Sequence, residues 1–207
     1  METFNRKNHW ENIYQTKASN ETSWYQQTPQ TSLDYLSACN IPTSAKIIDI
    51  GGGDSLLVDY LLDLGYKDIT VLDISAKAID RAKQRLADRA DKVKWIVADI
   101  AYFMPTESYD FWHDRAAFHF LTDEDDITSY VETVKENKPR WYFGHRYIFR
   151  TRSQKCSGIE IKQYSETSLV NPFNVYFDKI NCQIVDHRTP SDSIQNFVFC
   201  SFQKKKS

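Results

Sequence analysis

The sequence predicts an α/β fold, in which a mostly parallel sheet carries helices on both faces and ends in a C-terminal antiparallel hairpin. Short apolar runs alternate with helical patterns through most of the chain, and β-rich segments separated by turn residues follow. Alternation of strands and helices is typical of a parallel sheet that is covered on both faces. The length of 207 residues fits one domain.

Apolar runs predict parallel strands at 46–50, 68–74, 93–100 and 109–113. Helical spacing predicts helices at 55–64, 76–90 and 122–138. Gly65 is a typical helix C-cap and Ser75 a typical N-cap. The third helix begins with an acidic first turn and ends before Pro139. The β-rich segments 141–149, 175–185 and 194–202 then predict further strands, the last ones forming the hairpin.

Composition excludes several classes of protein. Hydrophobic residues make up 41%, so a core can form, and the formal net charge of -2 argues against nucleic acid or an anionic membrane as partners. Four widely spaced cysteines fit neither a disulfide scaffold nor a zinc site, so we expect reduced thiols. We see no signal peptide and no membrane anchor, which predicts a cytoplasmic protein.

Three of the six glycines are consecutive, and they follow the first strand. Gly51, Gly52 and Gly53 let the backbone approach a ligand, and the helix that follows offers unpaired N–H groups. Asp73 ends the second strand about 20 residues further on, where a carboxylate can accept both ribose hydroxyls. This spacing predicts a cofactor that carries a nucleoside.

The acidic residue before the glycines narrows the choice of cofactor. The dinucleotide pattern G-x-G-x-x-G would need glycine at Leu56, whose bulk blocks the close approach of a pyrophosphate. Asp49 also disfavours a phosphate and suits a ligand that bears an ammonium group.

In order, IIDIGGGDS, VLDIS and VADI resemble the cofactor motifs of class I S-adenosylmethionine-dependent methyltransferases. The segments HWENIY, SWYQ and DFWHDRAAFHFLTDEDD are similar to small bacterial members related to protein lysine methyltransferases. The resemblance covers nearly the whole chain. It implies a single methyltransferase domain over 1–207, with an N-terminal helical lid at 1–40 and a Rossmann-like core at 45–203.

The resemblance also implies roles for individual residues. Asp49, Gly51 and Gly53, with Gly52 between them, would face the methionine part of S-adenosylmethionine, and Asp73 would hold the ribose. Asp99 would bind the adenine amino group, with the ring between Ile74 and Ile100. The product would be S-adenosylhomocysteine. Ser55 departs from the pattern, since the family more often has glycine there.

Candidate catalytic residues follow the fourth strand, because the carboxyl ends of the strands line the ligand crevice in open α/β sheets. Asp114 is the first candidate for orienting a cationic acceptor, His119 the second, and His113 should point to the same crevice. The alternative is that Asp114 only pairs with Arg115. No third ligand has suitable spacing for zinc on the two histidines.

Aromatic residues in the polar N-terminal segment need cover, so we expect this segment to fold over the crevice. Trp24 and Tyr25, together with Phe118, are candidate acceptor contacts, since an aromatic wall favours a cationic group. Structural packing is an equal alternative for Trp10 and Tyr14.

Segment 140–154 is rich in arginine where the fold needs a buried strand. One hypothesis is a pair of compensating frameshifts, since suitable synonymous codons read in another frame give GGILVIGTFSERGPK. The alternative is a basic edge that recruits RNA or an acidic protein.

The sequence thus predicts methylation of a nitrogen on a protein lysine or a small amine. A nicotinamide-dependent reductase and a non-catalytic cofactor-binding protein are the alternatives. The acceptor is a protein or a small molecule, with no membrane partner, and the sequence carries no signal for an oligomeric state.

Overall fold

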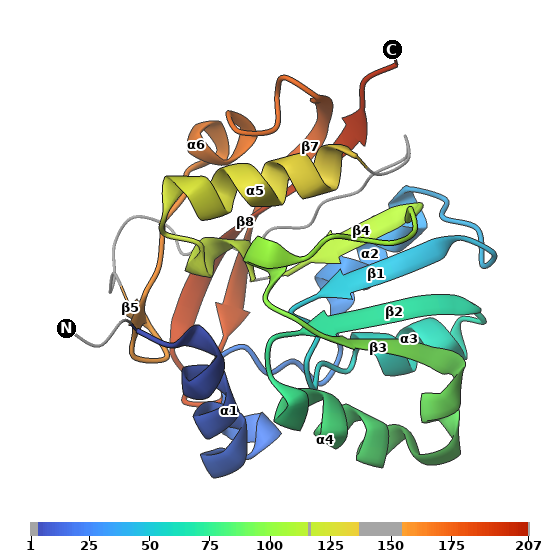
Figure 1. Ribbon diagram of the computed structural model, residues 1–207, viewed down its shortest axis with the longest axis vertical. Helices are drawn as coiled ribbons and strands as arrows, with labels where there is room; N and C mark the ends of the chain where they lie inside the picture. The colour runs from blue at the N-terminus through green and yellow to red at the C-terminus, as the bar shows by residue number, and fades with distance from the viewer. Residues whose placement is uncertain (1–3, 116, 137–154, 207) are drawn as a thin grey trace.

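The computed structural model describes residues 4–115, 117–136 and 155–206. Its central sheet has parallel strands in the order β3-β2-β1-β4 (Figure 1). These strands are β1 (Lys46–Ile50), β2 (Asp68–Asp73), β3 (Val93–Val97) and β4 (Phe111–Asp114). The predicted fold class is confirmed, and β1 has the predicted bounds.

Helices connect these strands as the sequence predicts. They are α3 (Leu57–Asp63), α4 (Ala76–Leu86) and α5 (Glu124–Lys135). Ser75 is the N-cap of α4, and its Oγ accepts a hydrogen bond from the backbone N–H of Ala78 at 3.2 Å. Helix α4 is shorter than predicted, because the backbone at Ala87 has φ of +49° and a 3-10 helix (Ala87–Lys92) follows.

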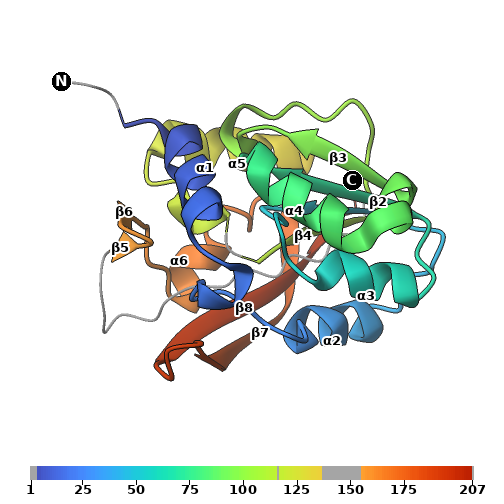
Figure 2. The same ribbon diagram turned by 90° about the horizontal axis from the view of Figure 1, so that it is seen from below.

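Alternate residues of each strand point to opposite faces of the sheet, and each face has its own core. On one face, Ile47, Val71 and Phe111 pack with residues of α3 and of α2 (Gln30–Ala38). On the other face, Ile48 and Trp112 pack with α5. Figure 2 shows α2, α3 and α4 together on one side of the sheet.

The hairpin joins β7 (Phe177–Arg188) to β8 (Ile194–Lys204) by antiparallel pairing. In the described part of the chain it forms a ladder separate from the parallel sheet. Phe197 and Phe199 of β8 pack against Tyr35 of α2, whereas Val198 and Cys200 belong to the α5 core. The two faces of β8 therefore continue the two layers of the sheet. Between α5 and the hairpin lie β5 (Lys155–Cys156), β6 (Ile159–Glu160) and α6 (Glu166–Val170).

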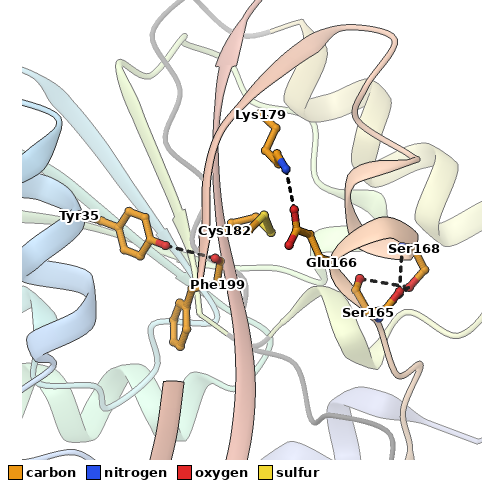
Figure 3. The surroundings of a disulfide bond; sticks show 8 residues. Tyr35, Ser165, Glu166, Ser168, Lys179, Cys182 and Phe199 are labelled. Carbon is orange, nitrogen blue, oxygen red and sulfur yellow. Dashed lines mark hydrogen bonds and ion pairs between the residues drawn. A yellow bond between two sulfur atoms is a disulfide. The ribbon is translucent and has the colours of Figure 1, made fainter. Parts of the chain in front are cut away.

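The prediction of reduced thiols is wrong for two cysteines, because Cys182 and Cys200 form a disulfide (Figure 3). The hairpin register pairs these residues directly, with Cα atoms 4.1 Å apart. Sequence spacing concealed the pair, since 18 positions separate two residues that the hairpin turn brings together.

The N-terminal segment, residues 4–40, contributes helices to two different parts of the molecule. Helix α1 (Arg6–Thr16) packs its buried Trp10, Ile13 and Tyr14 against Ala78 of α4, and a 3-10 turn (Ser19–Glu21) follows. Helix α2 instead lies under the sheet, and the Tyr35 hydroxyl donates to Phe199 O at 3.1 Å. Only the part before α2 is therefore in a position to cover a crevice.

None of the helices in the described ranges has the length and apolar character needed to cross a bilayer. Segment 140–154, with both of its interpretations, and the predicted strand at 141–149 lie outside the described residues.

Candidate active site

A cavity opens at the carboxyl ends of β1, β2 and β3, where a parallel sheet is expected to bind its ligand. Strand-end residues form its floor: Asp49, Gly51, Gly52, Asp73, Ile74, Asp99 and Ile100. Other segments form its walls: Trp10, Tyr14, Trp24, Arg115, His119, Phe120 and Phe197. The structure therefore brings together nearly all of the cofactor residues that the sequence predicts.

The glycine turn leaves no room for side chains. A Cβ on Gly52 would lie 2.6 Å from Asp49 Oδ2 and 2.8 Å from Val71 Cγ1. Gly51 and Gly53 have φ of +63° and +43°, a region that favours glycine. Gly53 is not among the cavity-lining residues, and a Cβ there would lie 2.8 Å from Asp73 Oδ2. The turn thus keeps a backbone surface next to two carboxylates.

Asp49 and His113 are register partners on β1 and β4, and their side chains form a buried pair. Asp49 Oδ1 lies 2.7 Å from His113 Nδ1, and His113 Nε2 lies 2.8 Å from Ser32 Oγ on α2. The expectation that His113 points into the crevice is therefore wrong. Strand alternation turns the ring toward α2, where it orients Asp49 instead.

Asp73 ends β2 and lies in an acidic neighbourhood. Burial, and then the nearby Asp54, Asp49 and Glu11 carboxylates, raise the pKa of Asp73 to about 7, although the Ser75 N–H opposes this shift. That N–H donates to Asp73 Oδ1 at 2.8 Å. A site with several carboxylates suits a ligand that brings positive charge and hydroxyl donors.

Asp99 follows β3, so it lies on the other side of the cavity floor from Asp49 of β1, with β2 between them. Its Oδ1 accepts from Ala101 N at 3.0 Å, and Arg6 Nε is 3.5 Å from Oδ2. Ile74 and Ile100 line the same end of the cavity. This end therefore combines apolar walls with one carboxylate.

Asp114 is fully buried and is not among the residues that line the cavity, where an acceptor contact was predicted. Its carboxylate accepts from the N–H groups of Ala117 and Phe118, at 2.8 and 3.2 Å. It also accepts from the Tyr130 hydroxyl at 2.7 Å. Alternation along β4 places Asp114 on the α5 face, where it stabilises the turn after the strand. The proposed pair with Arg115 is absent as well, since Arg115 Nη1 donates to Trp24 O and Gln26 Oε1.

Of the predicted acceptor contacts, Trp24 lines the cavity, whereas Phe118 and Tyr25 do not. Phe118 is fully buried, and its ring centroid lies 4.8 Å from that of Tyr130 and 5.4 Å from that of Phe173, so the structure places it in the core beside α5. Apolar packing against α5 decides its direction. Phe120, two residues further on, lines the cavity instead.

His119 is the predicted catalytic candidate that does line the cavity. Its ring centroid is 4.1 Å from that of Phe120, and its side chain is buried. Among the described residues, no group of three potential metal ligands gathers around either histidine.

One wall of the cavity, next to helix α1, is formed by the aromatic rings of Trp10, Tyr14, Trp24 and Phe120. The Trp10 centroid is 4.8 Å from Phe120, 5.7 Å from Trp24 and 6.4 Å from Tyr14. Trp10 and Tyr14 therefore pack against neighbouring apolar side chains and also line the cavity. Sequence reasoning did not assign Arg115 or Phe120 to the site, although Arg115 stands next to the predicted candidates.

Comparisons with known proteins agree with this geometry. Residues 47–137 match a family model described as a methyltransferase domain. The eEF1A lysine and N-terminal methyltransferase of Bos taurus is 29% identical over 132 residues, which cover 60% of this chain and 18% of that protein. The malonyl-[acyl-carrier protein] O-methyltransferase of Anoxybacillus flavithermus is 28% identical, over 61% of this chain and 49% of that one. The chain thus spans about a fifth of the length of the eEF1A enzymes it matches.

Solved structures share the fold at low identity. N-methyltransferase NodS from Bradyrhizobium japonicum, in complex with S-adenosylhomocysteine, superposes with a TM-score of 0.70 at 15% identity, covering 95% of this chain and 98% of NodS. An S-adenosylmethionine-dependent methyltransferase from Anabaena variabilis gives 0.75 at 11% identity, covering 98% and 96%.

The fold is thus shared with S-adenosylmethionine-dependent methyltransferases of known structure, and the family match at residues 47–137 is to a methyltransferase domain.

Proposed function

We propose that this protein transfers a methyl group from S-adenosylmethionine to a nitrogen of a cationic amine, on a protein lysine or a small molecule. The observation that carries the proposal is the cavity itself. Its floor gathers Asp49, Asp73 and Asp99 from three successive strand ends, and its wall is aromatic.

The residues present fit the cofactor. The methionine part of the cofactor is zwitterionic, so it needs a carboxylate for its ammonium group and a backbone that it can approach closely. Asp49 supplies the carboxylate, and the glycine turn, where Gly52 has no room for a side chain, supplies the backbone. Asp73 is suited to the ribose hydroxyls, and Asp99 between apolar walls to the adenine amino group. The cofactor supplies an activated methyl group on a sulfonium.

The chain's own contribution to transfer is to position the acceptor and to exclude water. The rings of Trp10, Tyr14, Trp24 and Phe120 favour an ammonium through their faces. An amine must lose a proton before its nitrogen can attack. His119, on the same cavity, is the side chain proposed to take that proton.

Isothermal titration with S-adenosylhomocysteine and with NAD tests the cofactor assignment. We expect S-adenosylhomocysteine to bind and NAD not to bind, and Gly52→Val should abolish binding because its Cβ has no room. Binding of NAD alone would favour the reductase.

A tritiated-methyl assay tests the acceptor. Cell lysate, separated into protein and small-molecule fractions, should gain label that survives mild base, as an N-methyl group does. Label released by base as methanol would indicate a carboxylate acceptor and contradict nitrogen methylation. Binding without any incorporation would favour a non-catalytic protein.

A further inference from the structure

The loop between α1 and α2, residues 17–29, borders the cavity, and we name it the lid loop. Its Ser23 and Trp24 line the cavity. Most of its residues are polar, so apolar burial alone does not fix its position. The Trp24 ring packs at the cavity wall, with its centroid 5.7 Å from that of Trp10. Hydrogen bonds to other elements therefore matter for the position of the loop.

These hydrogen bonds reach the lid loop from two sides of the cavity. On the side of the parallel sheet, Arg81 and Arg115 donate to backbone carbonyls of the loop, at 2.6 and 3.0 Å. On the side of the hairpin, His187 Nε2 lies 2.8 Å from Ser23 O. Among the described residues, His187 is the one hairpin side chain that forms a hydrogen bond with the lid loop. It therefore joins two elements that are far apart in sequence.

His187 is a buried donor on a strand that is otherwise largely exposed. The side chains of β7 mostly face solvent, but His187 is only 8% exposed. A carbonyl oxygen can only accept, so Nε2 must carry the hydrogen. Removal of this donor would leave the Ser23 carbonyl without the hydrogen bond that the hairpin gives it.

The bond also connects two parts of the cavity wall. Across the hairpin, His187 is the register partner of Gln195, and its ring centroid is 5.9 Å from that of Phe197. Both of these β8 residues line the cavity, as Ser23 and Trp24 do. The cofactor residues assigned above lie instead at the strand ends of the floor. The His187 bond therefore belongs to the part of the cavity that is left for the methyl acceptor.

We propose that His187 is a positioning residue for the methyl acceptor: it holds Ser23 on the hairpin and so keeps Trp24 in the wall that faces the acceptor nitrogen. This inference rests on the proposed function. His187 itself does not line the cavity, so it acts through the two segments that it joins. Loss of its bond should loosen the lid loop and weaken acceptor binding, whereas the cofactor residues stay in place.

The first test separates acceptor binding from turnover. Initial rates of tritiated-methyl transfer are measured at increasing concentrations of the lysate fraction that gains label. His187→Phe keeps a ring but lacks the donor, and it should raise the apparent KM for that fraction roughly 3- to 10-fold, the scale of one hydrogen bond. The kcat at saturation and the affinity for S-adenosylhomocysteine should change little, as expected when only acceptor binding is lost.

Two further variants give the rescue and the matched control. His187→Gln keeps a side-chain N–H donor and should recover part of the loss in apparent KM. Arg188→Gln changes the exposed neighbouring position and should behave as the wild type.

Hydrogen exchange measures the lid loop directly and needs no acceptor. Amides of residues 17–29 should exchange faster in His187→Phe than in the wild type and in Arg188→Gln, while those of β1 and β2 keep their protection. A change in only one of the two readouts, apparent KM or lid-loop exchange, would overturn the proposal.

The remaining outcomes also decide. If the wild type binds no S-adenosylhomocysteine, or if no lysate fraction gains label, the proposed function fails and this inference fails with it. If His187→Phe loses cofactor affinity as strongly as acceptor affinity, His187 supports the whole cavity and is not a positioning residue for the acceptor. Circular dichroism checks folding. If His187→Phe does not fold, His187→Asn replaces it, and its shorter side chain should give the same rise in apparent KM.

Discussion

Glu11 of α1 caps helix α4 together with Ser75, although the two residues are far apart in sequence. Glu11 Oε2 accepts from Ser75 Oγ at 2.8 Å and from Lys77 N at 3.1 Å, and Oε1 accepts from Ala76 N at 2.9 Å. These bonds lower the pKa of Glu11, although burial opposes them as the largest single influence. One carboxylate therefore fixes the cavity-lining helix α1 to the strand end that carries Asp73.

Glu11→Ala should lower the free energy of unfolding by about 1 to 2 kcal/mol, because an N-cap and a favourable helix-dipole contact are lost. Affinity for S-adenosylhomocysteine should fall as well, since α1 carries part of the cavity wall. Thermal melting and calorimetry measure the two effects. Asn12→Ala, at the exposed neighbouring position, is the control, and equal melting of both variants would contradict the cap.

Affinity for S-adenosylhomocysteine should depend on pH through Asp73, whose pKa is about 7 in the ligand-free protein. The ribose hydroxyls donate, so they bind the ionised carboxylate. Affinity should therefore fall by up to about tenfold per pH unit below pH 7 and level off above it. Calorimetry from pH 6 to 8 should also detect proton release on binding.

Asp73→Asn should remove this pH dependence, and Asp73→Ala should weaken binding by about 1.5 to 3 kcal/mol. The raised pKa of Asp73 also makes the free energy of unfolding depend on pH when no ligand is bound. The stabilising contribution of Asp73 is fully present below pH 3.8, the ordinary pKa of an aspartate, and is lost as the pH rises through about 7. An unchanged affinity in both variants, with intact circular dichroism, would show that Asp73 does not hold the ribose.

Asp114→Asn should destabilise the protein while turnover per folded molecule remains close to that of the wild type. Asn loses a charged acceptor for Ala117 N, Phe118 N and the Tyr130 hydroxyl, for which we expect a loss of about 2 to 3 kcal/mol. Tyr130→Phe removes one of these bonds and should cost less. Normal melting with lost turnover would restore Asp114 to the mechanism.

Substitutions of His119 and His113 should have different effects on turnover and on cofactor binding. His119→Gln should reduce single-turnover rates by roughly 100-fold with little change in cofactor affinity, the scale for a positioned proton acceptor. His113→Gln should instead weaken cofactor binding, because His113 orients Asp49. If His119→Gln retains full turnover, the proton leaves by another route.

The hairpin disulfide should be detectable in solution. Thiol titration of the denatured, unreduced chain should show two reactive thiols out of the four cysteines. Cys200→Ser should lower stability by about 3 kcal/mol, since the bridge closes a loop with a sequence separation of 18. Cys39→Ser is the control. Four reactive thiols would mean that the bridge does not form.

The sequence by itself determined that helices cover both faces of a mostly parallel sheet, and it identified the residues of the cavity floor. Asp49, Asp73 and Asp99 lie at or near the ends of successive apolar runs. Parallel strands bring their carboxyl ends to one edge of the sheet, so pattern alone brings these carboxylates together. The glycine turn was equally readable, because only glycine fits its backbone and its space.

Only the tertiary structure decided where the side chains at the end of β4 point. Adjacent strand residues face opposite layers, so His113 turns to α2 and Asp114 to α5, and neither reaches the cavity. The Glu11 cap, the hydrogen bonds of Arg115 to Trp24 and Gln26, and the Cys182–Cys200 bridge all depend on segments distant in sequence. Local pattern carries no information about such contacts, because packing between separate elements creates them.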